Sequence, residues 1–133
     1  MKWIRISTYV ACIMLVFASC KKSDLQSSPN MIMGRWQIES NVFNEYYNYQ
    51  NHESVFYGRP NDYFDFRQDG YVVISNNGYV ENLRYTFSSD NRLNIDGEVF
   101  EIRSLTNTQM ILYNRKHYSV GEYDENTYYL YRY

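Results

Sequence analysis

The chain has few of the residues that enzymes use for chemistry. It contains two cysteines and two histidines among 133 residues. No His-x-x-x-His or Glu-x-x-His spacing occurs, no nucleophile is paired with a base, and there is no phosphate loop or dinucleotide fingerprint. The carboxylates of Asp62 and Asp65 are typical of a solvated strand face. These absences predict a protein that is not an enzyme and holds no metal or other cofactor.

Alanine is also scarce, and this bears on fold class. The only two alanines, Ala11 and Ala18, precede residue 20, and no long charged helical stretch follows them. Tyrosine, by contrast, occurs 16 times, and Tyr, Phe, Val and Ile favour strands. The chain beyond residue 20 is therefore predicted to be almost entirely β.

Residues 1–20 have the pattern of a bacterial export signal. Lys2 and Arg5 give a positive start, an apolar run covers residues 9–17, and small residues precede Cys20. The run is too short to span a bilayer. The sequence Phe17-Ala18-Ser19-Cys20 resembles the lipobox of bacterial lipoproteins, with Phe in place of the usual Leu. The resemblance implies cleavage after Ser19 and a lipid on Cys20; the alternative is an ordinary secreted protein with an incidental cysteine.

Location follows from that processing. Two or three acyl chains on Cys20 anchor a protein stably in a membrane, and Lys21 after the cysteine suggests the outer membrane by resemblance. The expected location is the cell envelope, as an outer-membrane lipoprotein that faces either the periplasm or the surface. Because Cys12 leaves with the signal peptide and Cys20 carries lipid, no thiol remains for a disulfide.

Three segments are predicted: a signal peptide (1–19), a lipidated flexible tether (20–30) and one small β domain (31–133). The formal charge of the whole chain is −2, and losing Lys2 and Arg5 makes the remainder more acidic. No basic cluster occurs beyond Lys21-Lys22 and Arg115-Lys116. Nucleic acid is therefore not an expected partner.

The domain divides into eight strand-like runs separated by turn signals such as Asp69-Gly70, Asn77-Gly78 and Asp96-Gly97. The runs are Gly34–Phe43, Tyr63–Arg67, Tyr71–Ser75, Tyr79–Phe87, Arg92–Ile95, Val99–Leu105, Gln109–Tyr113 and Thr127–Arg132. Sequential strands with short hairpins predict an eight-stranded antiparallel up-and-down β-barrel. An immunoglobulin-like sandwich is the structural alternative.

Side-chain alternation predicts which residues fill the barrel. Trp36, Ile38 and Val42 are expected on the inner face of the first strand, opposite Arg35 and Gln37. The other strands also point large side chains inward, so the interior should hold a small cavity or none, and any buried ligand should be apolar.

The residues at the start of the first strand resemble a known family. Gly34-Arg35-Trp36 is similar to the Gly-x-Trp signature of the lipocalins and the wider calycin group. The segments YFDFRQDGYVVIS, YTFSSDNRLNID and FEIRSLTNTQMILY resemble the short lipocalin-like domains of Bacteroidota lipoproteins. The resemblance covers about residues 34–132. It implies an arginine near the end of the last strand, here Arg132, that packs across Trp36 and latches the closed end; the alternative is a free terminal charge.

Two long connections, residues 44–62 and 114–126, are expected to lie as loops over the other end of the barrel. A possible rim for a ligand or partner comprises Tyr46, Tyr47, Tyr49, His52, Phe56, Tyr57 and His117. A possible outer aromatic patch comprises Ile111, Tyr113, Tyr129 and Tyr131, a surface that suits a partner or a homodimer. The alternatives are aromatic rings that only cap the core, and tyrosine pairs with no partner.

Two functions are compatible with these features. The first is a lipid-anchored, lipocalin-like envelope protein that binds a small apolar ligand without catalysis. The second is a filled barrel that contacts an envelope protein or a glycan through its aromatic surfaces. A cavity above about 300 Å³ would favour the first function.

Overall fold

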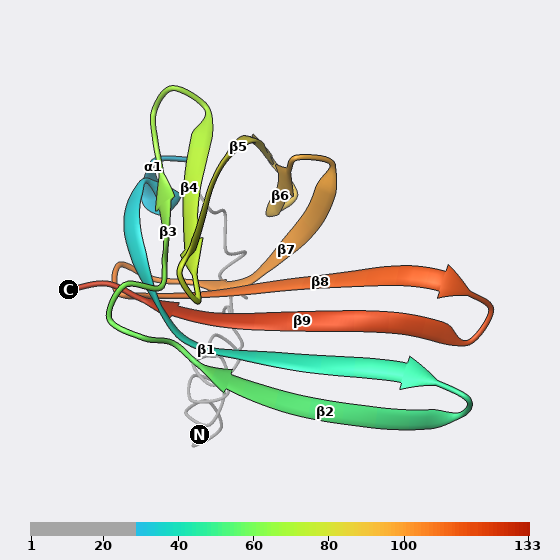
Figure 1. Ribbon diagram of the computed structural model, residues 1–133. Coiled ribbons are helices and arrows are strands. Elements are labelled where there is room, and N and C mark those ends of the chain that lie inside the picture. The colour runs from blue at the N-terminus through green and yellow to red at the C-terminus, as the bar shows by residue number, and fades with distance from the viewer. Residues whose placement is uncertain (1–28) are drawn as a thin grey trace, which may run out of the picture.

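The computed structural model describes residues 29–133, which form one short helix and nine strands (Figure 1). Helix α1 spans Pro29–Ile32, so it takes up the last two residues assigned above to the tether. The strands are β1 (Gly34–Tyr47), β2 (Gln50–Tyr57), β3 (Tyr63–Phe66), β4 (Tyr71–Asn76), β5 (Tyr79–Ser88), β6 (Arg92–Ile95), β7 (Glu98–Leu105), β8 (Gln109–Ser119) and β9 (Glu122–Tyr131).

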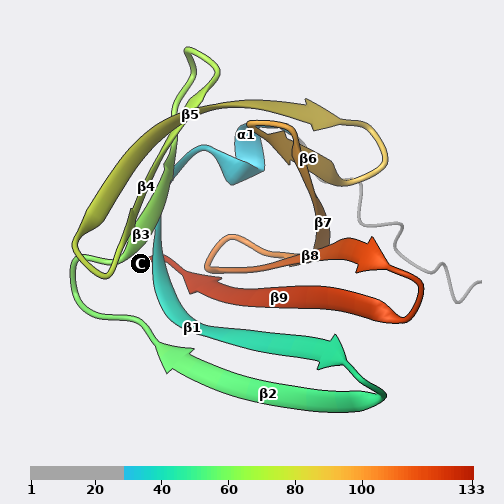
Figure 2. The same cartoon turned by 45° about the vertical axis from the view of Figure 1, so that its right-hand side comes forward.

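Eight of these strands close into a barrel. β1 pairs with β3, each later strand pairs with the next, and β9 pairs back onto β1, all antiparallel. The ring is visible in Figure 2, with α1 inside it. The predicted all-β, closed, eight-stranded up-and-down barrel is confirmed, and the sandwich alternative is wrong.

The hairpin turns form where the sequence places residues that tolerate positive φ. Asn77 and Gly78 join β4 to β5 with φ of 51° and 86°, and Asp96 and Gly97 join β6 to β7 with φ of 50° and 92°. Two consecutive residues with positive φ give the turn whose twist matches that of the flanking strands. These connections, with the tips of the β1–β2 and β8–β9 hairpins, lie at the end of the barrel opposite α1.

Large apolar side chains fill the interior at the α1 end. Trp36, Val72, Leu93, Met110 and Leu112 have no solvent exposure. Phe66 packs edge-on against Tyr85 with ring centroids 5.2 Å apart, a geometry that aromatic pairs favour. The α1 end of the barrel is therefore a packed core, as its inward side chains predict.

Helix α1 seals this end through two side chains. The Trp36 indole Nε1 donates to the carbonyl of Ile32 at 2.8 Å. The Arg132 guanidinium carbon lies 4.0 Å from the centre of the Trp36 ring. Arg132 also donates to the carbonyls of Met31 (3.0 Å), Met33 (2.6 Å) and Asn107 (2.8 Å). The guanidinium thus ties the residue that follows β9 to α1, to the residue that precedes β1 and to the β7–β8 turn.

Replacing Arg132 with Ala should lower the free energy of unfolding by about 2–4 kcal/mol, because three charge-assisted hydrogen bonds and the contact with Trp36 are lost together. Arg132→Lys keeps the charge but not the planar fork, so its loss should be intermediate. Arg84→Ala, which removes an exposed arginine that contacts Tyr71, should change stability by less than about 0.5 kcal/mol. Urea unfolding measures all three; equal losses for Arg132→Ala and Arg84→Ala would contradict this account.

A bulge in β1 changes which residues face inward. The pairing with β9 shifts between Ile38 and Ser40, so one extra residue is inserted and the alternation reverses. Above the bulge Asn41 and Phe43 continue the inner face begun by Ile38, and Val42 points outward. The expectation that Val42 shares a face with Trp36 is wrong for this reason.

The two long connections are mainly strands instead of loops. β1 and β2 form one hairpin and β8 and β9 another, and both project beyond the barrel as a four-stranded sheet in the order β2-β1-β9-β8 (Figures 1 and 2). Tight turns make this possible, with Asn48 and Tyr49 at φ of 51° and 59° and Gly121 at 79°. The sequence did not reveal the extension because aromatic and polar side chains are mixed on both of its faces.

Residues 1–28, which include the predicted signal peptide, most of the tether and Cys20, lie outside the described part of the chain. Within residues 29–133 no helix is long and apolar enough to cross a bilayer.

Candidate functional site

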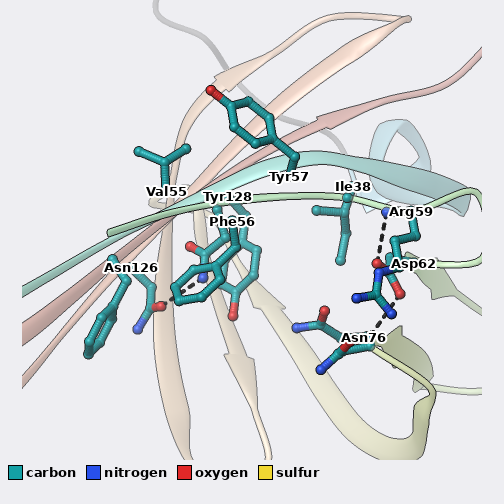
Figure 3. Close-up of a pocket in the computed structure, with 13 residues that line it drawn as sticks. Ile38, Val55, Phe56, Tyr57, Arg59, Asp62, Asn76, Asn126 and Tyr128 are labelled. Atoms are coloured by element: carbon teal, nitrogen blue, oxygen red, sulfur yellow. Dashed lines mark hydrogen bonds between the residues drawn. The ribbon is translucent and has the colours of Figure 1, made fainter. Parts of the chain in front are cut away.

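A cavity of about 650 Å³ lies where the projecting sheet leaves the barrel (Figure 3). Its walls come from β1, β2, β9, the connection after β2 and the β4–β5 turn. The lining residues are Ile38, Asn41, Phe43, Val55, Phe56, Tyr57, Gly58, Arg59, Asp62, Asn76, Asn77, Asn126 and Tyr128. The volume is within the range of small-molecule sites, about 300–1,000 Å³. The expectation of a small cavity or none therefore holds only for the packed α1 end of the barrel.

Asp62 fixes one wall of this cavity. Its buried carboxylate accepts from the backbone N–H of Arg59 and of Asn77, both at 2.8 Å, which joins the connection after β2 to the β4–β5 turn. The Asp62 carbonyl accepts from the backbone of Ile38 (2.8 Å) and from the Gln37 side chain (2.9 Å). Both carboxylate oxygens are thus engaged by the protein's own backbone, and the wall is held in place before any ligand arrives.

Gly58 allows the same connection to lie directly on β1. Its N–H donates to the Glu39 carbonyl at 2.9 Å, and a Cβ at position 58 would lie 1.9 Å from the carbonyl oxygen of Ile38. Since that neighbour is backbone, a side chain here cannot be accommodated by a rotamer change. Only glycine permits this wall at its present position.

Uncharged polar side chains line the part of the cavity formed by β1 and β9. The Asn41 amide nitrogen donates to the Asn126 side-chain oxygen at 3.1 Å, which joins β1 to β9. The Asn41 side-chain oxygen is buried and accepts no hydrogen bond from any described residue. The side-chain oxygens of Asn44 and Asn114, which do not line the cavity, are in the same state, so this unpaired acceptor is not particular to the site.

Apolar side chains form the rest of the cavity. Ile38 and Tyr128 lie at its base, and Phe43 is partly buried beside them. Phe56 points from β2 toward the cavity in Figure 3, while the Val55 and Tyr57 side chains point away. Phe56 is 59% exposed, so an apolar ligand would cover a large ring that water now contacts.

Arg59 supplies the one cationic side chain among the lining residues. Its backbone N–H and carbonyl hold the wall, through Asp62 and through Gln37 at 2.6 Å. Within residues 29–133 no carboxylate lies within 4.0 Å of the Arg59 guanidinium. The guanidinium groups of Arg35 and Arg115, by contrast, each form an ion pair with a carboxylate. The charge of Arg59 is therefore available to an anionic group in the cavity.

The residues of the predicted rim do not form one group. In the projecting sheet Tyr47, His52 and Phe56 share the inner face, and Tyr47 stacks on His52 at 4.9 Å. Tyr46 and Tyr57 point outward, and Tyr49 is 94% exposed at the hairpin turn. Because adjacent strand residues point to opposite faces, an aromatic run cannot gather on one side.

His117 lies on the outer face, so the two histidines are on opposite sides of the sheet. It packs against Tyr123 (5.8 Å), which in turn stacks on Tyr46 (5.1 Å). Across residues 29–133 no group of three His, Cys, Asp or Glu is placed to hold a metal ion.

The predicted outer patch is brought together on β8 and β9. Ile111 lies directly opposite Tyr129, and Tyr131 packs edge-on against Tyr133 with centroids 5.5 Å apart. Tyr113 contacts the Arg103 guanidinium, whose carbon lies 3.3 Å from the ring centre. The patch is thus partly covered by charged side chains and by its own neighbours.

Glu125 connects this patch to a small charged network. It accepts from the Tyr113 hydroxyl and from the Arg115 guanidinium, whose Nε lies at 2.7 Å. Burial acts to raise the pKa of Glu125, but the hydrogen bonds from Tyr113 and Arg115 outweigh it and hold that pKa below its ordinary value. Burial, and then the hydrogen bond to Glu125, raises the pKa of Tyr113.

Acid should therefore weaken the fold through Glu125. Because its pKa is lower in the folded than in the unfolded chain, its contribution is present above the unfolded pKa, about 4.3, and is lost as the pH falls through the folded pKa. Glu125→Gln should flatten the acid limb of the stability–pH curve, and Tyr113→Phe should flatten it partly. Urea titrations between neutral pH and about pH 3 measure this; an unchanged acid limb in Glu125→Gln would contradict it.

Sequence reasoning missed Asn41, Arg59 and Asn126. It also placed Asp62 on a solvated strand face, which is wrong, because Asp62 is buried in the connection before β3. The sequence Gly58-Arg59-Pro60-Asn61-Asp62 carries a turn signal, but nothing in it shows that the turn meets the β4–β5 hairpin.

No protein-family model matches the chain, and no curated protein matches its sequence. Two similar solved structures are of bovine odorant binding protein. A deswapped triple mutant is 16% identical with a TM-score of 0.43, over 77% of this chain and 74% of that one. A complex with a selenium-containing odorant is 16% identical with a TM-score of 0.44, over 83% and 76%. At this similarity neither assigns the chain to a family.

Proposed function

We propose that this protein is a non-enzymatic, lipocalin-like binding protein of the cell envelope that holds a small amphipathic molecule in the cavity between the barrel and the projecting sheet. The observation that carries the proposal is the cavity itself. It combines about 650 Å³ of space with the exposed Phe56 ring and the cation of Arg59. An apolar surface and a charged group in one cavity of this size are what a small-molecule site requires.

The lining specifies the kind of ligand. Ile38, Phe43 and Phe56 suit an apolar body, which agrees with the apolar ligand expected from the sequence. Arg59 adds a cation at the wall, so the favoured head group is an acid such as a carboxylate. Asp62 does not repel that head strongly, because two backbone N–H groups engage its carboxylate.

The acid head is tested by comparing 11-(dansylamino)undecanoate with its uncharged methyl ester. Arg59→Gln should weaken binding of the acid about three- to tenfold and leave the ester unchanged, because it removes only the side-chain charge. Phe56→Ala should weaken both probes. Arg67→Gln is the matched control, since Arg67 is also exposed with its backbone bonded, but lies at the α1 end.

Fluorescence titration of each variant gives the dissociation constants. If neither probe binds the unmodified protein, ligand binding in this cavity is wrong. If both bind but Arg59→Gln affects them equally, the site exists and the acid preference is wrong.

Anchoring at the envelope is part of the same proposal. It is supported by the lipobox-like residues before Cys20 and by Lys21 after it, which favour the outer membrane. Since α1 enters the barrel at the end opposite the hairpin tips, a lipid on Cys20 would leave the cavity facing away from the membrane.

Mass spectrometry of the protein from a bacterial envelope tests the anchor. The first residue should be Cys20 carrying a diacylglycerol thioether, and Cys20→Ser should move the protein from the membrane to the soluble fraction. An unmodified chain that begins elsewhere, equally distributed in both forms, would show an ordinary secreted protein.

The alternative, an interaction module that contacts an envelope protein or a glycan, rests on the outer patch of Ile111, Tyr113, Tyr129 and Tyr131. Tyr129 is 36% exposed and neighbours Tyr131 and Tyr133 on the same side. Such a surface suits partner contact. It is compatible with ligand binding, because patch and cavity lie on opposite faces of the sheet.

A further inference from the structure

Strand β2 has no neighbour on one edge. It pairs only with β1, and in both views no other described element lies beyond it (Figures 1 and 2). All eight of its residues are exposed, including Val55 (44%), Phe56 (59%) and Tyr57 (80%). A free edge that carries apolar side chains, contains no Pro, Lys or Arg and bears one charge, Glu53, has little of the usual protection against pairing with another strand.

The direction of the free backbone groups follows from the hairpin. Gly58 N–H bonds to Glu39, and hydrogen-bonded and non-bonded pairs alternate from there along the register of β1 and β2. The turn at Asn48 and Tyr49 agrees with this, because a two-residue turn closes on a bonded pair. The N–H and C=O groups of four β2 residues therefore point away from β1. These residues are Asn51, Glu53, Val55 and Tyr57.

We propose that β2 pairs antiparallel with β2 of a second copy of this chain, with the two-fold axis at Ser54. Asn51 then bonds to Tyr57 of the second copy and Glu53 to Val55, each twice by symmetry. All four outward residues are used, so the edge is complementary to itself. The two projecting sheets become one continuous sheet.

Bond number and charge select this register over its two neighbours. An axis at Val55 would leave Asn51 opposite position 59, beyond the end of β2, so fewer bonds would form. Shifting the pairing so that the axis lies at Glu53 keeps the bonding pattern but places two carboxylates directly opposite each other, which is destabilising. With the axis at Ser54, Glu53 faces Val55, and His52 faces Phe56 of the second copy. His52 already stacks on Tyr47, so an aromatic row would continue across the contact.

The other free edge of the sheet does not pair with itself. Residues 114–119 of β8 pair only with β9 in the described part of the chain. This edge carries Arg115, Lys116 and His117 in succession, so two copies would oppose basic residues. Self-pairing is therefore specific to β2, which gives a closed dimer instead of an open chain of molecules.

Cross-linking of the full-length protein in mild detergent tests the register. Ser54→Cys should form a disulfide-linked dimer on mild oxidation, because the two Ser54 residues would be a non-bonded antiparallel pair with Cα atoms about 4.5 Å apart. Asn51→Cys is the matched control, since its two copies would lie about 20 Å apart. The unmodified protein measures the background from any chains that keep Cys12 or an unlipidated Cys20. Ser54→Cys should exceed both at least fivefold.

A second pair of variants tests the edge without cysteine. Val55→Pro removes an N–H that points away from β1, a change that an edge strand tolerates. It should halve the mass measured by light scattering, whereas Val55→Thr keeps the N–H and should remain dimeric. Thermal unfolding checks that both variants keep the fold.

Four results would overturn the proposal. The first three are a monomer at all concentrations, equal cross-linking of Ser54→Cys and Asn51→Cys, and a dimer that survives Val55→Pro. A dimer that survives Val55→Pro would indicate that the two copies meet through the outer patch. Growth beyond dimers, without a Ser54→Cys cross-link, would indicate head-to-tail pairing of β2 with the basic β8 edge and would equally overturn it.

Discussion

The pairing of β1 with β9 is the constraint on which the rest of the molecule depends. It runs from Gln37 to Tyr46 of β1, so the same ladder that closes the barrel continues into the projecting sheet. On its other edge β1 pairs with β3 up to Gln37 and with β2 from Ser40 onward. One strand therefore belongs to two structures, and the bulge at Glu39 is where it changes from one to the other. The cavity lies at that change.

The two ends of the barrel differ because their inward side chains differ. Near α1 they are large and apolar, and Arg132 holds the helix, the first strand and the end of the last strand together. Above the bulge the inner face carries Asn41 and Asn126, which cannot form a close-packed apolar core. A stable closed end thus supports an open end that is free to carry binding groups.

The projecting sheet offers surfaces for contact in addition to the cavity. Its inner face meets the cavity and its outer face carries tyrosines held by Arg103, Arg115 and Glu125. Its edges differ in chemistry, since β8 is basic and β2 carries only Glu53 as a formal charge. Contact through the outer face uses groups of its own. Ligand binding and pairing at the β2 edge share one segment of β2, in which the cavity uses the Phe56 ring and the pairing uses the backbone of Val55 and Tyr57.

The sequence alone determined the parts that local chemistry controls. Turns at Asn77-Gly78 and Asp96-Gly97 require positive φ, and alternation around Phe64 and Phe66 separates an apolar from a polar face, so the closed barrel was predictable. Tertiary structure decided the rest. The bulge that moves Val42 outward depends on pairing with a strand some ninety residues away. The hairpin extensions mix aromatic and polar side chains on both faces, so no alternation reveals them. One wall of the cavity depends on the contact between Asp62 and Asn77, which lie in two different connections. Such contacts depend on which distant segments of the chain lie side by side in the fold, and a local sequence pattern does not contain that information.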